Sequence, residues 1–440
     1  MTEIDINKIS IYQPTINIGM LGHVSNGKTS ITRSITGIST LKHSSEKKRN
    51  ITIKLGYANA KIGKCNSCPK PKCYQSYSSN IMSPICKHCK GSVEILRHVS
   101  FVDCPGHNAL MSVMLNGTCI MDTALLVEAC DSIVPKPQTI EHLAAANISG
   151  INNMIVCLNK VDLVDKMECI EKYKLLKEFT KGTCAEKSPF IPISANYGYN
   201  IDVLCEYICT KIPHVSRSLD TYGKLVVIRS FNINKPGESY KKLIGGVIGG
   251  ALLQGIIKIG QLITIYPGIV SINKGKLEYK PIRSKILKIM SEKNSLDLAI
   301  PGGLIAIELS IDPSIAKNDN LVGNIAIVNN NEIDNKPKVC DEITIKYLQM
   351  KNFCGDKTKK IKSIKIDEEI IINVNSANIK CRVINVDKKE LTLRTINRPI
   401  CVFLDDKISI IRKFDNWRLV GMGDLIIDKC NEIIYDMYYE

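Results

Sequence analysis

The segment GHVSNGKTS, residues 22–30, constrains the fold of this chain more than any other stretch. It follows an apolar run that contains INIG and precedes residues that can continue as a helix. In this context the pattern G-x-x-x-x-G-K-[ST] indicates a phosphate-binding loop. Gly22 and Gly27 let the backbone curl, so that successive amide hydrogens and the helix N-terminus face a phosphate. Lys28 adds a positive charge between the β- and γ-phosphates, and Thr29 offers a hydroxyl to Mg²⁺. A glycine turn that caps an ordinary helix is the alternative. The residues predicted to bind the nucleotide here are Gly22, Ser25, Asn26, Gly27, Lys28, Thr29 and Ser30.

The region around this loop alternates apolar runs with amphipathic stretches. Such alternation predicts an α/β domain, in which a parallel sheet carries helices on both faces. The expected strands lie near residues 15–22, 98–104, 123–129 and 153–159, and the expected helices begin near residues 28, 108, 139 and 167. We assign residues 1–212 to this nucleotide-binding domain, with an insertion at about residues 62–92.

The pattern of apolar and polar residues changes after Pro213. Short β-branched runs punctuated by glycine follow, as in residues 243–268, 301–309 and 320–328, and helical periodicity disappears. This pattern predicts closed antiparallel β-barrels. The polar stretch NNNEIDNKPK, residues 329–338, is a predicted linker, so we expect one barrel over residues 213–332 and a second over residues 333–440.

The composition indicates a globular protein with a basic surface. Apolar residues make up 44% and charged residues 23% of the 440 residues, so several cores can form. No stretch approaches the roughly 20 apolar residues of a membrane span, and the N-terminus does not resemble a signal peptide. We therefore expect a soluble, cytoplasmic protein with no membrane partner. The net charge of +16 favours polyanions such as RNA, although a Lys- and Ile-rich genome would produce the same bias. The run KTKKIKSIK, residues 357–365, is more typical of a solvated loop or strand edge than of an RNA contact.

Two further segments can sense the γ-phosphate and its metal ion. FVDCPGH gives a strand that ends in Asp103, whose carboxylate can hold Mg²⁺ through water, followed by Gly106, whose amide can reach the γ-phosphate. In the segment between the loop and Asp103, Thr52 can offer its hydroxyl to Mg²⁺ and its amide to the γ-phosphate. This segment is predicted to be ordered with GTP and released with GDP. The alternative is that Thr52 is an ordinary strand residue with no contact to Mg²⁺ or nucleotide.

Two later segments identify the base. LNKVD and PISAN each follow an apolar strand, where open α/β sheets bind ligands. A carboxylate at Asp162 can accept both N1–H and the 2-amino group of guanine, whereas adenine offers neither hydrogen. Sites built on such hydrogen bonds reject a mispaired analogue by roughly 10⁴ to 10⁵. Lys160 would lie along the base, and the Ala195 amide would meet O6. The nucleotide is therefore predicted to be GTP or GDP, bound also by Asn159, Lys160, Asp162, Ser194, Ala195 and Asn196.

His107 is the predicted catalytic residue for GTP hydrolysis. It follows Gly106, where small GTPases place a glutamine that orients the attacking water. Val24 and Ile51 are predicted to form an apolar gate that restrains the imidazole. A structural histidine beside the phosphate loop is the alternative. No arginine of the sequence is an obvious arginine finger for this site. Slow GTP hydrolysis by the chain alone, accelerated by another protein, is therefore expected.

Five of the 18 cysteines lie close together in the insertion. Two C-x-x-C pairs, Cys65 with Cys68 and Cys86 with Cys89, are separated by 17 residues. Each pair can form a knuckle, and the spacing predicts a closed Cys₄ site for structural zinc. Cys73 is a spare thiol that could replace a ligand or pack in the core.

Beyond these motifs, four longer segments resemble the gamma-subunit family of eukaryotic and archaeal translation initiation factor 2. They are RNITIKLGYANAKI, LRHVSFVDCPGHNALMSVMLNG, IPGGLIAIELSIDP and NWRLVGMG. The resemblance runs from about Ile16 to the C-terminus. It implies a G domain followed by two β-barrels, which carry initiator methionyl-tRNA to the small ribosomal subunit as a ternary complex with GTP. It also implies work with alpha and beta subunits in a heterotrimer, with a GTPase-activating factor and with a guanine-nucleotide exchange factor.

The sequence departs from the family at three positions. Most relatives carry histidine where this chain has Asn26, several carry aspartate or alanine at Ser25, and an acidic residue is common at Asn108. An additional cation near Ser25 is therefore not predicted. The altered pair Ser25 and Asn26 motivates an alternative, a GTP-binding scaffold subunit without useful hydrolysis. A second alternative is an elongation or selenocysteine-type tRNA-carrying GTPase, which the Cys-rich insertion and the NWRLVGMG ending disfavour.

Overall fold

A computed structural model describes residues 6–40, 46, 52–328, 336–350, 352–353, 356–414 and 417–433. The chain divides into two compact units, residues 1–216 with 354–356 and residues 217–353 with 357–440. The predicted boundary after residue 212 stays a prediction. The predicted boundary between residues 332 and 333 lies outside the described part of the chain.

The first unit contains a seven-stranded sheet in the order β3-β2-β4-β1-β5-β6-β7. Strands β4, β1, β5, β6 and β7 are parallel, whereas β2 is antiparallel to both β4 and β3. The sheet is therefore mixed rather than wholly parallel, because β2 reaches β4 through a hairpin strand and not through a crossover helix. The strands are β1 (Ile16–Leu21), β2 (Gly56–Cys65), β3 (Tyr74–Ser78), β4 (Val93–Asp103), β5 (Thr123–Ala129), β6 (Met154–Asn159) and β7 (Phe190–Pro192).

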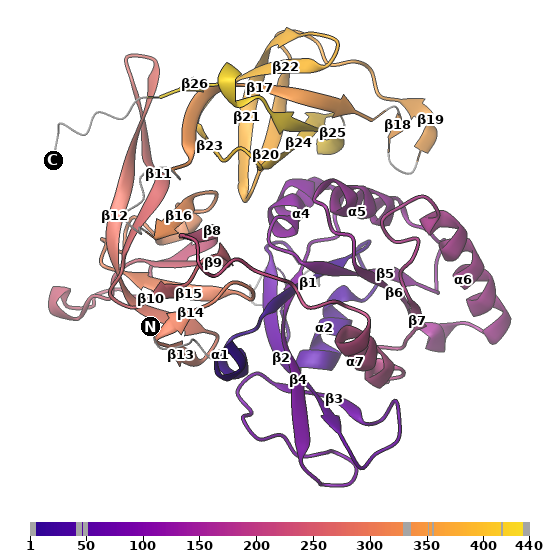
Figure 1. Ribbon diagram of the computed structural model, residues 1–440. Coiled ribbons are helices and arrows are strands. Elements are labelled where there is room, and N and C mark those ends of the chain that lie inside the picture. The colour runs from indigo at the N-terminus through magenta and orange to yellow at the C-terminus, as the bar shows by residue number, and fades with distance from the viewer. Residues whose placement is uncertain are drawn as a thin grey trace. The chain divides into compact units, whose positions relative to one another are not determined.

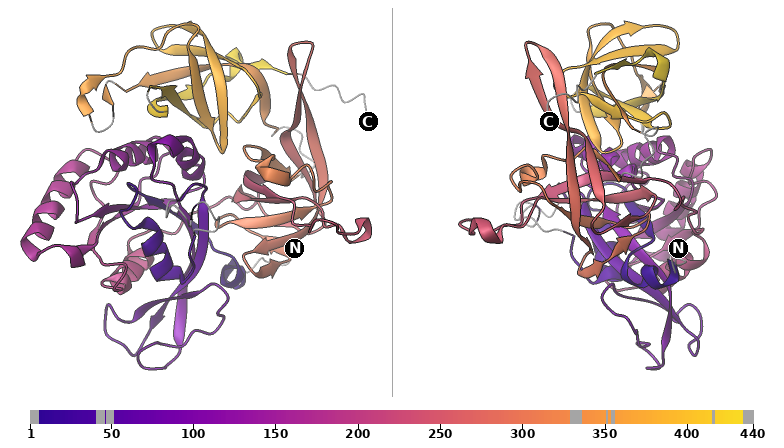
Figure 2. Two further views of the ribbon diagram at one scale, coloured as in Figure 1. Left: turned by 180° about the vertical axis from the view of Figure 1, so that it is seen from behind. Right: turned by 60° about the vertical axis from the view of Figure 1, so that its left-hand side comes forward.

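Helices cover both faces of this sheet (Figures 1 and 2). Helices α2 (Lys28–Thr36) and α7 (Ile201–Thr210) pack on one face, where Ile31 and Ile35 of α2 share a core with Ile18 and Met20 of β1. Helices α4 (Met111–Thr118), α5 (Pro137–Ile148) and α6 (Lys166–Thr180) lie along the other face. Helix α1 (Ile6–Tyr12) contacts β4. The short helices η1 (Asn108–Leu110) and η2 (Val161–Leu163) follow β4 and β6.

The second unit consists of two closed antiparallel β-barrels, as predicted. The first runs β11-β16-β8-β9-β15-β12 and closes because β12 pairs again with β11. Buried and less buried residues alternate along β15, so the apolar face fills the barrel. Its strands are β8 (Gly223–Phe231), β9 (Val247–Gln254), β11 (Leu262–Asn273), β12 (Lys276–Ser291), β15 (Ile305–Leu309) and β16 (Ile325–Val328), with the shorter β10 (Ile257–Lys258), β13 (Asn294–Leu296) and β14 (Leu298–Ala299) and helices η3 (Tyr240–Lys242) and η4 (Lys317–Asp319).

The second barrel runs β22-β21-β20-β24-β25-β17 and closes through the pairing of β22 with β17. Its own core cluster fills it, separate from that of the first barrel. Its elements are β17 (Lys338–Gln349), β20 (Glu369–Val374), β21 (Ala377–Val386), β22 (Glu390–Thr395), β23 (Ile400–Val402), β24 (Lys407–Lys413), β25 (Trp417–Leu425), β26 (Asn431–Glu432) and η6 (Ile427–Lys429), and the pair β18 (Asn352–Phe353) and β19 (Asp356–Lys360) stands apart from the sheet.

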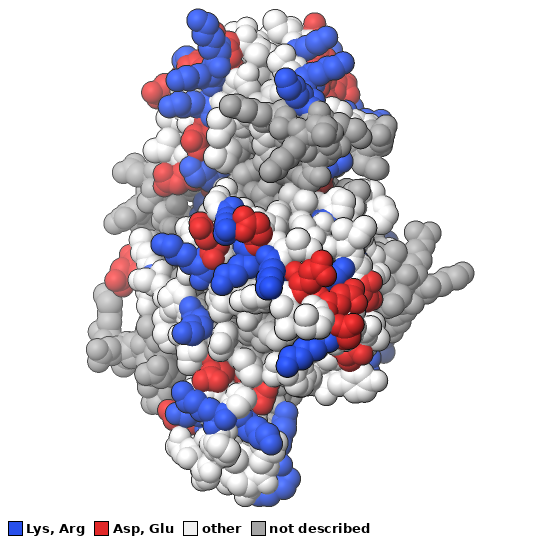
Figure 3. Space-filling view, turned by 90° about the vertical axis from the view of Figure 1, so that its right-hand side faces the viewer, with Lys and Arg blue, Asp and Glu red and all other residues white. Residues whose placement is uncertain are grey.

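The basic run at residues 357–365 is only partly a solvated segment. Its first residues, 357–360, belong to β19, and the side chains of residues 351–359 lie outside the described ones. Ile361 and Ile364 are buried in the core of the second barrel. On the face in Figure 3, Lys and Arg side chains are interspersed with Asp and Glu side chains in small groups. The described residues of that face therefore form no single continuous basic patch.

No helix in the described part of the chain is long and apolar enough to cross a membrane.

Candidate functional site

The strand ends of the first unit surround a cavity of about 280 Å³ above the N-terminus of α2. The loops that follow β1, β4, β6 and β7 all contribute, as expected at the carboxyl ends of parallel strands. Every lining residue is one that the sequence predicted for nucleotide binding or hydrolysis. They are Val24, Ser25, Gly27, Lys28, Thr29, Ser30, Thr52, Gly106, Asn159, Lys160, Asp162, Ser194, Ala195 and Asn196.

The phosphate loop adopts the curled backbone that its glycines permit. Gly27 precedes α2 with a φ of 92°, and a Cβ placed there would clash with Asn159 Nδ2. Lys28 is buried, and its Nζ donates to the carbonyl oxygens of Gly22 and His23, each at 2.8 Å. Burial lowers the pKa of Lys28 to about 8, against the opposing effect of the Asp103 carboxylate. The loop thus concentrates a cation and a helix N-terminus at one end of the cavity, where they can hold phosphate.

Oxygen ligands converge beside Lys28. Asp103 is fully buried, and its Oδ2 accepts from Thr29 Oγ1 at 2.7 Å and from Thr40 Oγ1 at 2.5 Å. Thr52 Oγ1 lies 3.4 Å from Thr29 Oγ1 and 3.5 Å from the same carboxylate oxygen. Among the described residues, Asp103 Oδ1 has no hydrogen-bond partner. Burial raises the pKa of Asp103, and the threonine hydroxyls limit the rise. Two hydroxyls and a buried carboxylate with an unused oxygen fit a hard cation such as Mg²⁺. The sequence reasoning missed Thr40, which no motif marks.

The segments predicted to recognise the base are joined by Asn159. Its Nδ2 donates to the carbonyl oxygen of Asn26 at 2.8 Å, and its Oδ1 accepts from the Ala195 amide at 3.1 Å. Asn159 therefore ties the phosphate loop to the PISAN segment. The Ala195 amide, predicted to meet O6 of the base, is engaged by this side chain in the structure.

Lys160 and Asp162 both line the cavity. Lys160 Nζ forms an ion pair of 2.7 Å with Asp131, a residue that the sequence reasoning did not single out. Asp162 is exposed in η2, lines the cavity, and has no polar partner among the described residues. Its carboxylate is therefore available to a ligand with two adjacent hydrogen-bond donors.

Four predicted residues do not line the cavity. Gly22 and Asp103 contact the lining residues Lys28 and Thr29. The side chain of Asn26 is turned into a buried network with Val127 and Glu128. His107 is exposed, and its Nδ1 accepts from the Ala109 amide at 3.2 Å. Ile51, predicted to gate His107, lies outside the described residues, as does the side chain of Asn108.

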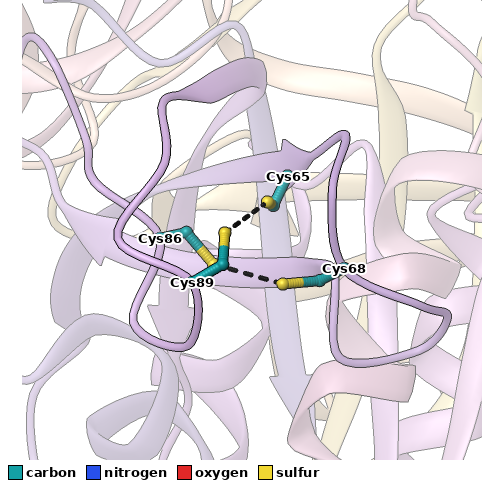
Figure 4. Close-up of side chains that lie close together, drawn as sticks. All are labelled: Cys65, Cys68, Cys86 and Cys89. Carbon is teal, nitrogen blue, oxygen red and sulfur yellow. Dashed lines mark hydrogen bonds between the residues drawn. The ribbon is translucent and has the colours of Figure 1, made fainter.

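A second candidate site lies at the end of β2 and in the segment between β2 and β4. The Sγ atoms of Cys65, Cys68, Cys86 and Cys89 all lie within 4.8 Å of one another (Figure 4). Although burial opposes it, hydrogen bonds from the amides of Cys89 and His88 and from Gln75 lower the pKa of Cys86 to about 5. Donors of this kind stabilise the Cys86 thiolate, and four sulfurs this close together fit a tetrahedral zinc ion. Cys73 is buried in the hydrophobic core and is not one of this group.

Known proteins match the chain along nearly its whole length. Residues 13–214 match the family model of the elongation factor Tu GTP binding domain, and residues 341–425 match that of initiation factor eIF2 gamma, C terminal. Eukaryotic translation initiation factor 2 subunit gamma of Schizosaccharomyces pombe is 41% identical, over 97% of this chain and 98% of that protein. Eukaryotic translation initiation factor 2 subunit 3 of Drosophila melanogaster is 39% identical, over 97% of this chain and 93% of that protein.

Solved structures show the same fold. The bacterial selenocysteine-specific elongation factor EF-Sec has a TM-score of 0.67 at 20% identity, over 93% of this chain and 58% of that one. Elongation factor SelB of Methanococcus maripaludis, solved with the GTP analogue GppNHp, has a TM-score of 0.67 at 20% identity, over 94% and 79%. At this identity the likeness concerns the fold alone.

The sequence relatives resemble this chain more closely than the structural neighbours do. The structural neighbours share the arrangement of a G domain and two barrels, whereas the sequence matches extend at about twice that identity through the C-terminal barrel. The chain therefore belongs to the family of the gamma subunit of translation initiation factor 2, and it is a GTP-binding GTPase of translation initiation.

Proposed function

We propose that the cavity above α2 holds GTP or GDP, with the phosphates at the loop of residues 22–30 and the guanine at Asp162. The proposal is supported by the convergence on one cavity of Lys28, the α2 N-terminus and the Asp162 carboxylate, which has no polar partner among the described residues. Thr29 and Thr52 would hold Mg²⁺ directly and Asp103 through water, and the ion would neutralise charge on the phosphates. The amides of Thr52 and Gly106 would contact the γ-phosphate, so that the segment around Thr52 responds to hydrolysis.

His107 is the proposed residue that orients the attacking water. It follows Gly106 directly, so a rotation of its exposed side chain toward the cavity would bring the imidazole to the γ-phosphate side. Val24 lines the cavity next to Gly106 and is proposed to restrain that rotation, together with Ile51. The exposed position of His107 also motivates the second candidate function, a GTP-binding scaffold subunit that does not hydrolyse GTP usefully.

We further propose that the GTP form carries initiator methionyl-tRNA to the small ribosomal subunit in the cytoplasm. The single observation that carries this proposal is the match to initiation factor 2 subunit gamma over 97% of the chain. The same match supports assembly with alpha and beta subunits, and interaction with a GTPase-activating factor and an exchange factor.

Filter binding of charged initiator tRNA tests the carrier function. We expect tight binding with GTP and weak binding with GDP, because a nucleotide switch works only through different affinities of its two states. Equal retention with both nucleotides contradicts the proposal. Competition with an elongator tRNA provides the control, since an elongation-type factor would bind both tRNAs.

We propose that the four cysteines of the insertion bind one structural zinc ion. The purified chain is expected to contain about one zinc per molecule, and Cys68→Ala is expected to lose it, because a closed site needs all four thiolates. Metal analysis by mass spectrometry measures both. The matched control is Cys73→Ala, which should keep the metal because Cys73 lies outside the group of four. Zinc loss in the control but not in Cys68→Ala would overturn this ligand set.

A further inference from the structure

The phosphate loop is held from behind by a buried polar network that no nucleotide-binding motif describes. Asn26 is fully buried, and its Nδ2 donates to Val127 O and to Glu128 Oε2, each at 2.8 Å. Its Oδ1 accepts from Lys136 Nζ at 3.2 Å. The amide therefore lies between a carboxylate and an ammonium group. Only one orientation of the amide satisfies both neighbours, so the side chain is fixed.

Glu128 is the buried centre of this network. It lies in β5 with no solvent exposure, and its Oε1 accepts from the Lys136 amide at 3.0 Å. Burial raises the pKa of the Glu128 carboxyl, and hydrogen bonds from Lys136, Thr139 and Asn26 limit the rise. Neither Glu128 nor Lys136 lines the cavity. Because a buried ionic network adds little stability compared with apolar packing, its clearest consequence here is to place Asn26.

Asn26 passes this constraint to the loop. Its carbonyl oxygen accepts from Asn159 Nδ2 at 2.8 Å, and the next residue is Gly27, in the left-handed conformation that starts α2. The amides that follow Asn26 belong to the helix N-terminus at the phosphate end of the cavity. Their direction therefore depends on where residue 26 is held.

Residues near the start of α5, close to Lys136 in the sequence, hold the other end of the loop. The Gly22 amide donates to His142 Nδ1 at 3.0 Å, and the His23 amide donates to Thr139 Oγ1 at 3.2 Å. Burial lowers the pKa of His142 to about 3, so its Nδ1 keeps the lone pair that accepts this hydrogen bond. Strand β5 and the start of α5 thus fix the loop at both ends.

We propose that Glu128 and Lys136 are positioning residues for nucleotide binding, which act through Asn26 to hold the phosphate loop in its binding conformation. The inference rests on the proposed function, in which this loop takes the phosphates of GTP. A loop held in place before binding loses less conformational freedom when the nucleotide arrives. Since GTP and GDP share the phosphates that the loop cradles, both nucleotides benefit equally.

A double-mutant cycle on nucleotide affinity tests the proposal. In the full chain, Glu128→Ala is expected to raise the Kd for both GTP and GDP by about 10- to 100-fold, because Asn26 loses the charged hydrogen-bond partner that orients it and such a bond usually contributes this much. In the Asn26→Ala background the same substitution should have no further effect, because Glu128 acts through Asn26. A merely structural role would instead give additive losses. Isothermal titration calorimetry measures all four proteins.

Two further variants keep the test informative. Lys61→Met is the matched control, since Lys61 is a fully buried charged residue of β2 that bonds Ile81 O and lies outside the network. It should bind nucleotide as the wild type does. Lys136→Ala provides the test if Glu128→Ala does not fold. It keeps the backbone amide that donates to Glu128, and it should also raise the Kd for both GTP and GDP.

The outcomes separate this inference from the proposed function. Unchanged affinities in Glu128→Ala and Lys136→Ala overturn the positioning role and leave the nucleotide site intact. A wild-type chain that binds neither GTP nor GDP refutes the proposed function itself.

Discussion

In Asp162→Asn, the affinity for GTP is expected to fall by about 10⁴-fold, and XTP is expected to become the preferred nucleotide. The Asp162 carboxylate lines the cavity without a polar partner among the described residues, so both oxygens can accept from guanine. Asparagine replaces one acceptor by an NH₂ group, which faces the 2-amino group of guanine donor against donor. Xanthine carries an oxygen at that position and accepts the hydrogen instead. Titrations of both proteins with GTP, XTP and ATP measure the change.

The matched control for this substitution is Asp165→Asn. Asp165 lies three residues further on, outside the cavity, and its carboxylate accepts from the Glu168 amide as the N-cap of α6. Asparagine also caps helices well, so the fold and the nucleotide preference should both persist. Equal GTP affinity in Asp162→Asn and the wild type would remove Asp162 from base recognition.

The second large effect concerns hydrolysis. In His107→Ala, single-turnover GTP hydrolysis with small ribosomal subunits and the activating factor is expected to slow by about 10²- to 10⁴-fold. GTP affinity should not change, because His107 does not line the cavity. His107→Gln should keep part of the rate, since an amide can also orient water. Rapid quench measurements of released phosphate follow all three proteins.

His214→Ala is the control for removal of an exposed histidine from the same unit. His214 lies outside the nucleotide cavity, so hydrolysis should proceed at the wild-type rate. If His107→Ala is as fast as this control, the chain is better explained as a GTP-binding scaffold, or another residue orients the water.

Residues in motifs were predictable because their chemistry is local. Lys28, Asp103 and Asp162 each lie at or after the end of an apolar strand, at the spacing of nucleotide-binding motifs, and strand ends of one sheet meet at one edge. The residues that support them were not predictable in this way. Thr40, Asp131 and Glu128 belong to no motif, and each is recognised only by the partner that the fold brings to it.

Asn26 separates the two kinds of information. Its position inside the loop predicted a contact with the nucleotide, but its side chain points away from the cavity into the network with Glu128 and Lys136. The partners lie more than 100 positions away in the chain. A loop motif specifies backbone shape, and it does not say which way a non-glycine side chain turns.

By itself, the sequence determined the G domain, the two barrels, the family and the cysteines that cluster, and it predicted the base that Asp162 would select. These follow from hydrophobic periodicity and from short motifs whose spacing is chemical. Only the tertiary structure decided that the sheet is mixed, that Asn159 joins two loops, and that a buried carboxylate stands behind the phosphate loop. The reason is physical: hydrogen bonds between distant segments depend on packing, which no local pattern records.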